Sequence, residues 1–456
     1  MPESPHLSPL TGWGRTARSG ARLLAVNVDT IAEIVTDAGD RGALARGLGR
    51  SYGDAAQNAG GVVMRLTGSA ADARIVRTRN EITVGGGVSI DDLLRIIVPR
   101  GYFVPVTAGT RFVTIGGAIA SDIHGKNHHG EGSFGNHVRR ITLLLADGTT
   151  TQLSPADQPD LFWATIGGMG LTGVVLEATI AVLPIETSRC IVDTSRVDDL
   201  DHVLALMEEG DYRYRYAVAW IDLMAKGRHL GRSILSRGDH ARLDQLTGPA
   251  IDAPLDYHAG VIASVPPLVP VSALNRVSIK VFNEMWFRKA PRSRVGELQT
   301  IPQYFHPLDM VGQWNLTYGP RGFVQYQILV PFGEETALRK VIERLASSGA
   351  ASFVTVLKRF GAANSAPLSF PAPGWTLTLD IPAGTHGLSA MLHELDTVVL
   401  DAGGRHYMAK DSHTTPEAIR RGYPRLAEWQ EIRNRADPKG VWQSDLARRL
   451  GLIDRV

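Results

Sequence analysis

The chain has 456 residues, and its 48 lysines and arginines nearly balance its 46 aspartates and glutamates. This length exceeds one ordinary hydrophobic core, so we expect two domains, each with a substantial interior. The near-zero net charge gives no overall field that would attract nucleic acid or an anionic membrane. The single cysteine, Cys190, excludes an intrachain disulfide framework and a cysteine-based metal cluster.

The N-terminal segment contains Glu3 and several prolines, but no basic region followed by an apolar one. We therefore predict no Sec signal peptide. The sequence also contains no uninterrupted apolar run long enough to cross a bilayer. Any contact with a membrane is expected to be peripheral.

The first predicted helix begins at Thr30. Thr30 and Glu33 have the spacing of a capping box, and Ile31, Ile34 and Val35 form an apolar helical face. The pattern predicts a short amphipathic helix there.

Residues 43–54 begin as an apolar strand and continue as a loop with glycines, arginines, a serine and a tyrosine at intervals. This is one candidate phosphate-facing loop. Residues 82–87 then predict a strand, and Ser89 is the expected N-cap of a helix that continues through Ile97.

Residues 107–130 combine glycines with hydroxyl side chains. Gly109, Gly116 and Gly117 remove side chains where another group must approach closely, and Thr110 and Thr114 supply short hydroxyl donors. Successive amides that point into one concavity bind anions. The stretch is therefore predicted to press its backbone against a phosphorylated, planar cofactor.

A run of titratable side chains ends this stretch: His124, Lys126, His128 and His129. A purely structural loop does not require them, so we expect cofactor and chemistry to meet here. Few carboxylates accompany these histidines, and their spacing does not establish a coordination geometry, so no metal is predicted. Lys126 could equally be a solvated loop lysine.

Beyond residue 130 the pattern predicts two strands joined by a turn at Asp147 and Gly148. A short helix then leads to residues 167–173, a third glycine cluster, and to the apolar strand 174–183. Three glycine-rich loops attached to strands in one N-terminal unit indicate a single extended ligand that crosses this unit.

From about Thr187 the elements become longer and amphipathic, which indicates a second domain. They include strands at residues 216–222 and 323–331 and a helix at residues 335–348. Residues 259–274 carry no charge and contain three prolines. They form either a buried connector or an apolar flap over a lipid-like ligand.

No glycine loop matches a Rossmann or P-loop motif, and Ser51 lies in no nucleophile elbow, which disfavours a hydrolase. Lys358 and Lys410 lie in apolar surroundings. Buried lysines are costly unless paired, so both are functional candidates, with a strand-edge position as the alternative. Gln325 and Gln327 share one strand face, where they either bind a sugar or meet solvent.

Five stretches carry a family resemblance: residues 45–54, 114–129, 132–137, 305–309 and 407–412. They resemble the decaprenylphosphoryl-β-D-ribose 2′-oxidase family, the flavin subunits of the actinobacterial epimerase that makes the arabinose donor of cell-wall arabinan. The resemblance runs from Leu10 to the C-terminus. More distantly, the N-terminal half is similar to FAD-binding domains of the vanillyl-alcohol-oxidase type.

The resemblance implies an α+β fold, a two-domain FAD-binding fold of that type with an antiparallel-sheet substrate domain. Residues 1–187 and 405–456 would form a discontinuous FAD-binding domain, and residues 188–404 the substrate-binding domain.

The implied FAD contacts come from the three glycine loops and the C-terminal segment. They are Arg46, Gly47, Leu48, Gly49, Arg50, Ser51, Tyr52, Gly109, Thr110, Thr114, Gly116, Gly117, Ser121, Ile123, His124, Asn127, Gly168, Gly173, Tyr407 and Lys410. In several relatives a histidine of the first loop bonds covalently to the flavin. Residues 49–53 here read Gly-Arg-Ser-Tyr-Gly, so noncovalent FAD is expected.

Lys410 matches the family lysine near the flavin pyrimidine edge, where a cation stabilises negative charge on the reduced flavin. Lys410 is therefore the first catalytic candidate. Tyr52, His124 and a water are alternatives for removing the substrate hydroxyl proton. The implied substrate-binding residues are Lys126, Phe305, Gln325, Gln327, Lys358, Thr378 and Asp380.

Two positions depart from the family pattern. Thr378 lies where the family has a pocket cysteine that thiol-directed nitroaromatic inhibitors attack, and Phe305 lies where well-known members have tyrosine. Neither position supplies the flavin's redox chemistry, so an oxidase is still expected.

The resemblance implies FAD-dependent oxidation of the 2′-hydroxyl of polyprenyl-phosphoryl-β-D-ribofuranose to a 2′-keto product. A separate NAD(P)H-dependent keto-reductase would complete the epimerisation. The alternatives are a sugar, alditol or aldonolactone oxidase of the same fold, and a noncatalytic flavin-binding or polyprenyl-phosphate-binding subunit. The expected location is the cell envelope, peripheral to the inner membrane, in the periplasm or at the cytoplasmic face.

Overall fold

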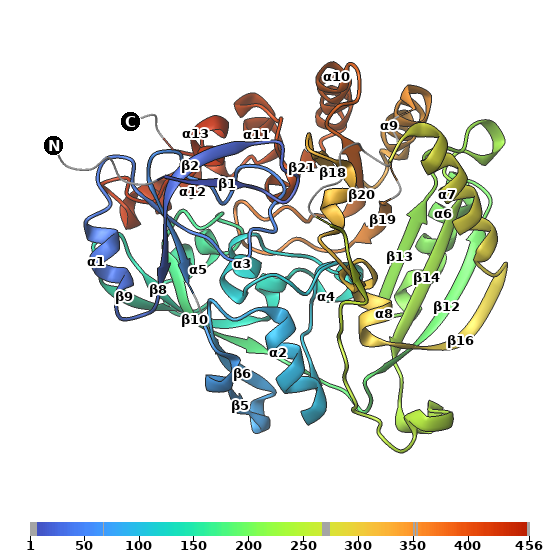
Figure 1. The fold of residues 1–456 in the computed structure, drawn as a ribbon, viewed down its shortest axis with the longest axis horizontal. Coiled ribbons are helices and arrows are strands. Elements are labelled where there is room, and N and C mark those ends of the chain that lie inside the picture. Colours follow the sequence, from blue (N-terminus) through green and yellow to red (C-terminus); the bar gives the residue numbers. More distant parts are fainter. Residues whose placement is uncertain (1–6, 67, 267–273, 350–351, 353, 454–456) are drawn as a thin grey trace.

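The computed structural model describes residues 7–66, 68–266, 274–349, 352 and 354–453. Figure 1 shows two groups of strands: β1 to β10 at the left and the larger sheet from β12 to β21 at the right. The C-terminal helices, drawn in red, return to the blue N-terminal strands.

The N-terminal residues form a four-stranded sheet of order β1-β2-β4-β3. Strand β1 (Ser8–Thr11) is antiparallel to β2 (Arg18–Val26), whereas β4 (Val62–Leu66) runs parallel to both β2 and β3 (Ala43–Ala45). Helix α1 (Ile31–Thr36) connects β2 to β3 and buries its apolar side. The first glycine loop leaves this sheet at the end of β3.

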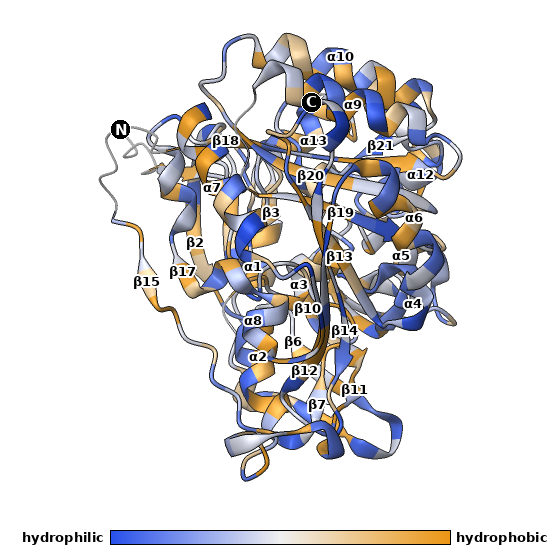
Figure 2. Cartoon of the chain, turned by 90° about the vertical axis from the view of Figure 1, so that its right-hand side faces the viewer, coloured by the Kyte–Doolittle hydropathy of each residue, from blue (hydrophilic) through white to orange (hydrophobic). Residues whose placement is uncertain are grey.

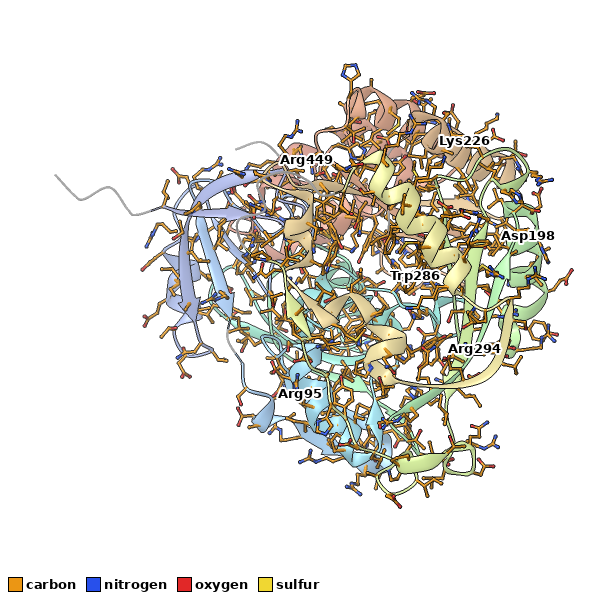
Figure 3. The ribbon with its side chains drawn as sticks, turned by 45° about the vertical axis from the view of Figure 1, so that its right-hand side comes forward. Arg95, Asp198, Lys226, Trp286, Arg294 and Arg449 are labelled. Carbon is orange, nitrogen blue, oxygen red and sulfur yellow. The ribbon has the colours of Figure 1, made fainter. Side chains whose placement is uncertain are left out.

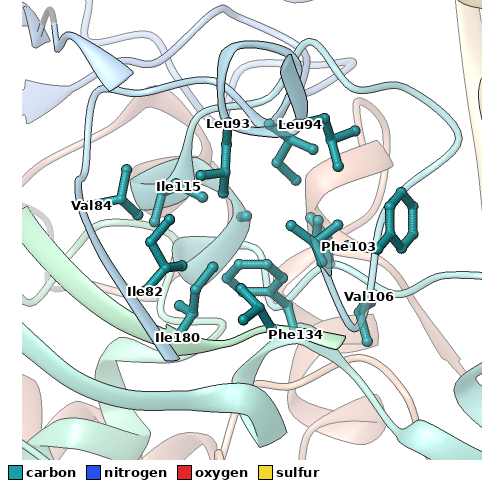
Figure 4. Packing of buried hydrophobic residues seen from close by; sticks show 14 of the residues in the cluster. Ile82, Val84, Leu93, Leu94, Phe103, Val106, Ile115, Phe134 and Ile180 are labelled. Atoms are coloured by element: carbon teal, nitrogen blue, oxygen red, sulfur yellow. The ribbon is translucent and has the colours of Figure 1, made fainter. Parts of the chain in front are cut away.

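A second sheet is antiparallel throughout and has the order β5-β6-β10-β8-β9. Its strands are β5 (Arg74–Val76), β6 (Glu81–Gly85), β10 (Val174–Ala181), β8 (Val138–Leu144) and β9 (Thr150–Leu153). Helices α2 (Ile90–Ile97), α3 (Ile115–Ala120) and α5 (Pro159–Thr165) accompany it. Figure 4 shows its core, where Ile82 and Ile180 pack with Leu93, Ile115 and Phe134.

The second half of the chain builds an eight-stranded antiparallel sheet of order β16-β12-β14-β13-β19-β20-β18-β21. Its strands are β16 (Ser293–Thr300), β12 (Arg189–Val197), β14 (Ser233–His240), β13 (Tyr216–Ile221), β19 (Thr355–Phe360), β20 (Gly374–Pro382), β18 (Phe323–Pro331) and β21 (Arg405–His406). The predicted antiparallel-sheet domain is confirmed.

The two faces of this sheet differ because side chains alternate along each strand. On β18, Val324, Tyr326 and Ile328 join the buried core under helices α6 (Leu200–Gly210), α9 (Glu335–Ser348) and α10 (Leu388–Asp401). The intervening Gln325 and Gln327 point to the opposite face. That opposite face is the one that borders the functional site.

Seven further elements lie between those of the sheets. They are α4 (His128–Glu131), α7 (Arg276–Lys289), α8 (Ile301–Phe305), β7 (Tyr102–Phe103), β11 (Leu183–Pro184), β15 (Ala263–Ser264) and β17 (Val311–Gly312). Strand β7 pairs with β11, and β15 pairs with β17. No helix within the described residues is long and apolar enough to cross a membrane.

Helices α11 (Pro416–Gly422), α12 (Leu426–Ala436) and α13 (Asp445–Leu450) pack against the N-terminal half. The Trp429 indole donates a hydrogen bond of 2.9 Å to the Ala164 carbonyl oxygen. Gly168 lies in the same contact, since a Cβ there would be 2.1 Å from that oxygen and 3.2 Å from the indole nitrogen. Only glycine fits at this junction.

Most predicted elements are present, and two predictions need correction. Ser89 caps α2 as predicted, and α9 has the predicted limits. The Thr30 capping box is wrong, because the Thr30 hydroxyl donates to Asn27 Oδ1 and makes no cap bond to the helix. Part of residues 107–130 is helix α3, not loop, because Thr114 accepts from Gly117 N and caps it.

Residues 259–274 lie partly outside the described residues, since 267–273 are not described. In the described part, Ile262 is 81% exposed and Val261 48% exposed, so this part is not a buried connector.

The domain limits stay a prediction. Residues 405–406 were assigned to the FAD-binding domain, yet as strand β21 they pair with β18 of the eight-stranded sheet.

Replacing Gly168 with alanine is predicted to destabilise the protein, because the added methyl group must displace the Ala164 carbonyl or the Trp429 ring. We expect a loss of about 2 to 4 kcal/mol and a melting temperature several degrees lower, measured by thermal unfolding. Gly130→Ala is the control, because a Cβ at Gly130 meets no atom within 4 Å. Equal melting temperatures for the two variants would contradict this packing argument.

Candidate active site

A cavity of about 1340 Å³ lies between the N-terminal glycine loops and the polar face of the eight-stranded sheet. It is larger than the pocket of a typical single small ligand, so it has room for a cofactor and a second molecule. The structure places these predicted site residues on its wall: Arg46, Gly47, Leu48, Gly49, Arg50, Ser51, Tyr52, Gly109, Thr110, Thr114, Gly116, Gly117, Ser121, Ile123, His124, Lys126, Gly173, Phe305, Gln325, Gln327, Lys358, Thr378, Tyr407 and Lys410.

The first loop follows β3 and is fixed by Arg46. The Arg46 guanidinium donates to the Ala56 carbonyl at 2.7 Å and to the Thr11 carbonyl at 2.8 Å. Gly47 lets this loop approach α3, because a Cβ there would be 2.4 Å from Thr114 Oγ1. Within the described chain, the amides of residues 47–51 donate no hydrogen bond. These free donors lie in a loop that lines the cavity.

The second loop is fixed by Asp309, which the sequence stretch 305–309 contains but which was not predicted as a site residue. Asp309 accepts from the Thr110 hydroxyl at 2.8 Å and from the Arg111 amide at 2.7 Å. Arg111 is fully buried, and its Nε donates at 2.6 Å to Asp91. This buried network holds the loop that leads into α3.

Three predicted residues lie away from the cavity wall. The Asn127 amide is buried and donates to the Pro105 carbonyl at 2.7 Å. Gly168 packs against Ala164, whereas Met169, Gly170 and Gly173 of the same loop line the cavity.

Asp380 is the third residue. It lies fully buried behind the wall, where it accepts from Gln325 Nε2 at 2.5 Å and from the Tyr318 hydroxyl at 3.4 Å. Burial raises the pKa of Asp380 to about 7. The acid therefore positions Gln325 and does not itself face the cavity.

His124 is held at both ring nitrogens. Its Nε2 lies 2.9 Å from the Gln327 side-chain nitrogen, and its Nδ1 lies 3.2 Å from Lys358 Nζ. Burial, together with the nearby Lys358 charge, moves the pKa of His124 well below its ordinary value. The imidazole is therefore neutral at working pH.

Lys410 lines the cavity from the short turn Met408–Lys410. Its ammonium is 4.0 Å from the centre of the Tyr52 ring, and the Tyr52 amide donates at 3.0 Å to the Ala409 carbonyl. Burial lowers the pKa of Lys410 to about 8. Burial also raises the pKa of the Tyr52 hydroxyl well above its ordinary value.

Two further lysines point into the same cavity. Lys126 donates to the Tyr304 carbonyl and lies 4.1 Å from the centre of the Tyr304 ring. Burial lowers the pKa of Lys126 to about 8, and burial with the neighbouring lysines lowers that of Lys358 to about 7. Asp309, a carboxylate that lines the cavity, already accepts from the Thr110 hydroxyl and the Arg111 amide, so the three buried lysines favour an anionic ligand.

The two departures from the family pattern both lie on the wall. Thr378 is half-buried on β20 and lies in register between Gln327 of β18 and Val356 of β19. Phe305 is buried and packs against Phe103 and Tyr216, with ring centres 4.9 and 4.7 Å away. Phe305 therefore contributes an apolar surface at this position.

The later histidines have structural partners. His128 Nδ1 accepts from the Gly361 amide at 3.1 Å, and His129 Nε2 lies 2.9 Å from the Tyr214 carbonyl oxygen. Among the described residues, no three histidines, cysteines or carboxylates gather in a way that could hold a metal ion.

Sequence reasoning also missed apolar residues of the wall, among them Trp220, Phe282, Trp286 and Val311. Trp220 follows the alternation of β13 and could have been found from it. The others reach the cavity only because α7 and β17 fold across its edge.

The residues present fit FAD. Five free amides in a cavity-lining loop suit a pyrophosphate, and the Gly109 position leaves more than 4 Å of open space where a side chain would project. The cavity that the glycine loops and the lysines line also has the volume for a ring system.

Comparisons with known proteins agree with this fit. Residues 21–154 match the family model described as an FAD binding domain, and residues 335–450 match the one described as D-arabinono-1,4-lactone oxidase. The predicted α+β FAD-binding fold of the vanillyl-alcohol-oxidase type is thereby confirmed.

Three similar proteins illustrate the relationship. The chain is 28% identical to an alditol oxidase of a Streptomyces species over 31% of its length, which is 34% of that protein. It is 40% identical to an uncharacterized Streptomyces coelicolor protein over 80% of its length, which is all of that protein. It is 46% identical to the decaprenylphosphoryl-β-D-ribose oxidase of Mycolicibacterium smegmatis over 97% of both chains. The protein therefore belongs to the decaprenylphosphoryl-β-D-ribose oxidase family of FAD-dependent oxidoreductases.

Proposed function

We propose that the protein oxidises the 2′-hydroxyl of polyprenyl-phosphoryl-β-D-ribofuranose to the 2′-keto compound. The observation that carries this proposal is the set of groups that line one cavity. The free amides of the first glycine loop suit a pyrophosphate, and the buried Lys126 and Lys358 suit the substrate phosphate. Gln325 and Gln327 on the same wall supply amides for the ribose hydroxyls.

When bound, FAD would supply the acceptor for the hydride from C2′ of the substrate. We propose that FAD is held without a covalent bond by the glycine loops and by the Tyr407 and Lys410 side of the cavity. Lys410 supplies a positive charge there, in a buried site where that charge stabilises developing negative charge more strongly than it would in water.

The hydroxyl proton must leave as the hydride departs. His124 is disfavoured as its acceptor because burial has moved the imidazole pKa well below the working range. The Tyr52 hydroxyl is disfavoured because its raised pKa leaves no phenolate to accept a proton. Neutral Lys410 and a water molecule remain as bases, and burial brings the pKa of Lys410 to about 8.

The alternative in the same class is an alditol or lactone oxidase. It is favoured by the match of residues 335–450, whereas the lysine pair in the cavity favours a phosphorylated substrate. A noncatalytic flavin-binding or polyprenyl-phosphate-binding subunit would need no charge beside the flavin, which the buried Lys410 provides. We further propose that a separate NAD(P)H-dependent keto-reductase consumes the product, and that the protein works in the cell envelope, peripheral to the inner membrane.

Reduction of the bound flavin tests the proposed function directly. Anaerobic addition of a polyprenyl-phosphoryl ribose is expected to bleach the yellow absorbance of the holoenzyme, whereas free ribose, alditols and aldonolactones leave it unchanged. The measurement is a titration followed by absorbance spectroscopy. Bleaching by an alditol and not by the phosphorylated lipid would support the alternative oxidase, and bleaching by none would support a binding subunit.

The role of Lys410 is tested by the pH dependence of flavin reduction. Because burial lowers the pKa of Lys410 to about 8, its ammonium is present below that pH and is lost above it. If the charge matters most, the single-turnover rate falls as pH rises through about 8, and Lys410→Met lowers the rate roughly 100-fold.

The Lys410→Arg variant stays positively charged above pH 8, so its single-turnover rate should not fall there. The Lys358→Arg variant is the control for titration of the neighbouring lysine. A wild-type rate that instead rises through pH 8 would assign Lys410 the role of the base.

The threonine at position 378 leads to a prediction about covalent modification by thiol-directed nitroaromatic compounds. A threonine hydroxyl does not form the adduct that a cysteine thiolate forms, so the wild-type enzyme is expected to bind such compounds reversibly. Thr378→Cys is expected to become covalently modified, because this side chain is half-buried on the cavity wall. Intact-protein mass spectrometry after turnover checks both; an adduct on wild-type residue 378 would refute the prediction.

A further inference from the structure

Helix α7 carries large apolar side chains on the side that faces away from the protein, unlike a surface helix that turns its whole apolar side to the core. The buried residues of its inward side are Ile279 and Asn283, and Asn283 donates at 2.8 Å to Asp222. Its outward side carries Val277, Val281 and Met285, which are 73%, 54% and 62% exposed. Large apolar side chains spaced four residues apart thus form a stripe that faces away from the protein.

This stripe continues into the mouth of the cavity. Trp286 is 45% exposed and also lines the cavity, and Val261 and Val311 on the neighbouring segments do the same at 48% and 40% exposure. We name Val277, Val281, Met285, Trp286, Val261 and Val311 the mouth patch. Figure 3 shows Trp286 on α7 with this side of the molecule turned forward. Figure 2 shows α7, β15 and β17 on one side of the molecule, where α7 carries both hydrophobic and hydrophilic colours.

Basic side chains surround the mouth patch. Arg276, Lys280 and Lys289 are exposed on α7 and form no ion pair within the part of the chain that the structure describes. The acidic residue of the helix, Glu284, is already engaged by Arg232 and Arg288, each at about the length of a strong ion pair. The outer surface of α7 therefore combines exposed apolar groups with uncompensated positive charge.

An apolar stripe flanked by lysine and arginine is the pattern of a helix that lies in the interface of a membrane with anionic lipids. A contiguous apolar patch of this kind is unusual on a protein surface that meets only water. A second copy of the chain would match the apolar stripe but would bring the same positive charges together. The charge therefore favours an anionic bilayer over self-association.

We propose that the mouth patch docks on the anionic surface of a lipid bilayer and turns the cavity mouth towards the membrane. The inference rests on the proposed function, because a substrate with a polyprenyl tail must leave a bilayer to reach the cavity. Docking at the mouth lets the tail stay in apolar surroundings while the phosphoryl ribose reaches Lys126 and Lys358 inside. The chain's small net charge does not oppose this, since the charge that matters is local to α7.

Co-sedimentation of the purified holoenzyme with vesicles tests the docking. The wild type is expected to bind vesicles of phosphatidylcholine with phosphatidylglycerol at least about tenfold more tightly than vesicles of phosphatidylcholine alone. The double variant Val281→Glu with Met285→Glu is expected to lose at least about tenfold in affinity. The double variant Lys280→Glu with Lys289→Glu is expected to lose the preference for anionic vesicles.

Val28→Glu is the matched control, because Val28 is 55% exposed and Val281 54%, and Val28 lies far along the chain beside α1. This control should bind vesicles as the wild type does. Wild-type failure to bind anionic vesicles, or binding by the Val281→Glu and Met285→Glu variant equal to wild type, would overturn the docking proposal. A dimer in gel filtration that this variant dissociates would also overturn it, in favour of a contact between copies.

Flavin reduction separates failure of the docking from failure of the proposed function. Val281 and Met285 do not line the cavity within the described chain, so their double variant should be reduced by a short-chain, water-soluble phosphoryl ribose at the wild-type rate. Vesicle binding without any flavin reduction would reject the proposed substrate and leave the docking supported. Flavin reduction without vesicle binding would reject the docking alone.

Discussion

The register of strands β18, β19 and β20 is the constraint on which both the core and the site depend. The strands place Tyr326, Leu357 and Leu377 in the core under α9 and α10, and they place Gln327, Lys358 and Thr378 on the cavity wall. A slip of one residue would exchange the two sets, and it would bury Gln327 and Lys358 among the helices while Tyr326 entered the cavity. Helix packing therefore selects the same register that the site requires, so stability and function do not compete here.

The second constraint is the cost of burying charge. Lys126, Lys358 and Lys410 all have pKa values lowered by burial, and the neighbouring lysines add repulsion at Lys358. An anionic ligand relieves both effects, because a phosphate near these groups favours their charged forms. The burial of these lysines thus favours anionic ligands, whereas a neutral sugar would gain only the hydrogen bonds of the glutamines.

Local signals in the sequence predicted much of the fold and the glycine loops, because strand alternation, N-caps and glycine clusters act over a few residues. Ser89 and the limits of α9 are examples. Long-range packing was not predictable in this way. Gly168 leaves room for Trp429, which is far away in the chain, and Asp380 lies behind Gln325 of the neighbouring strand. The family resemblance correctly pointed to the strand that contains Asp380. The structure then shows that Thr378 of this strand reaches the cavity and that Asp380 does not.

The position of Lys410 joins these constraints. Strand β21 pairs with β18, and the chain then turns so that the Ala409 carbonyl accepts from the Tyr52 amide of the first glycine loop. Directly beyond, Asp411 is fully enclosed. Burial opposes its ionisation, but Arg449 holds the pKa of Asp411 well below its ordinary value, and Arg449 also binds Asp54 at 2.7 Å. Through Arg449, the C-terminal helix α13 therefore links the turn that carries Lys410 to the first glycine loop. This link fixes the position of the Lys410 charge relative to that loop.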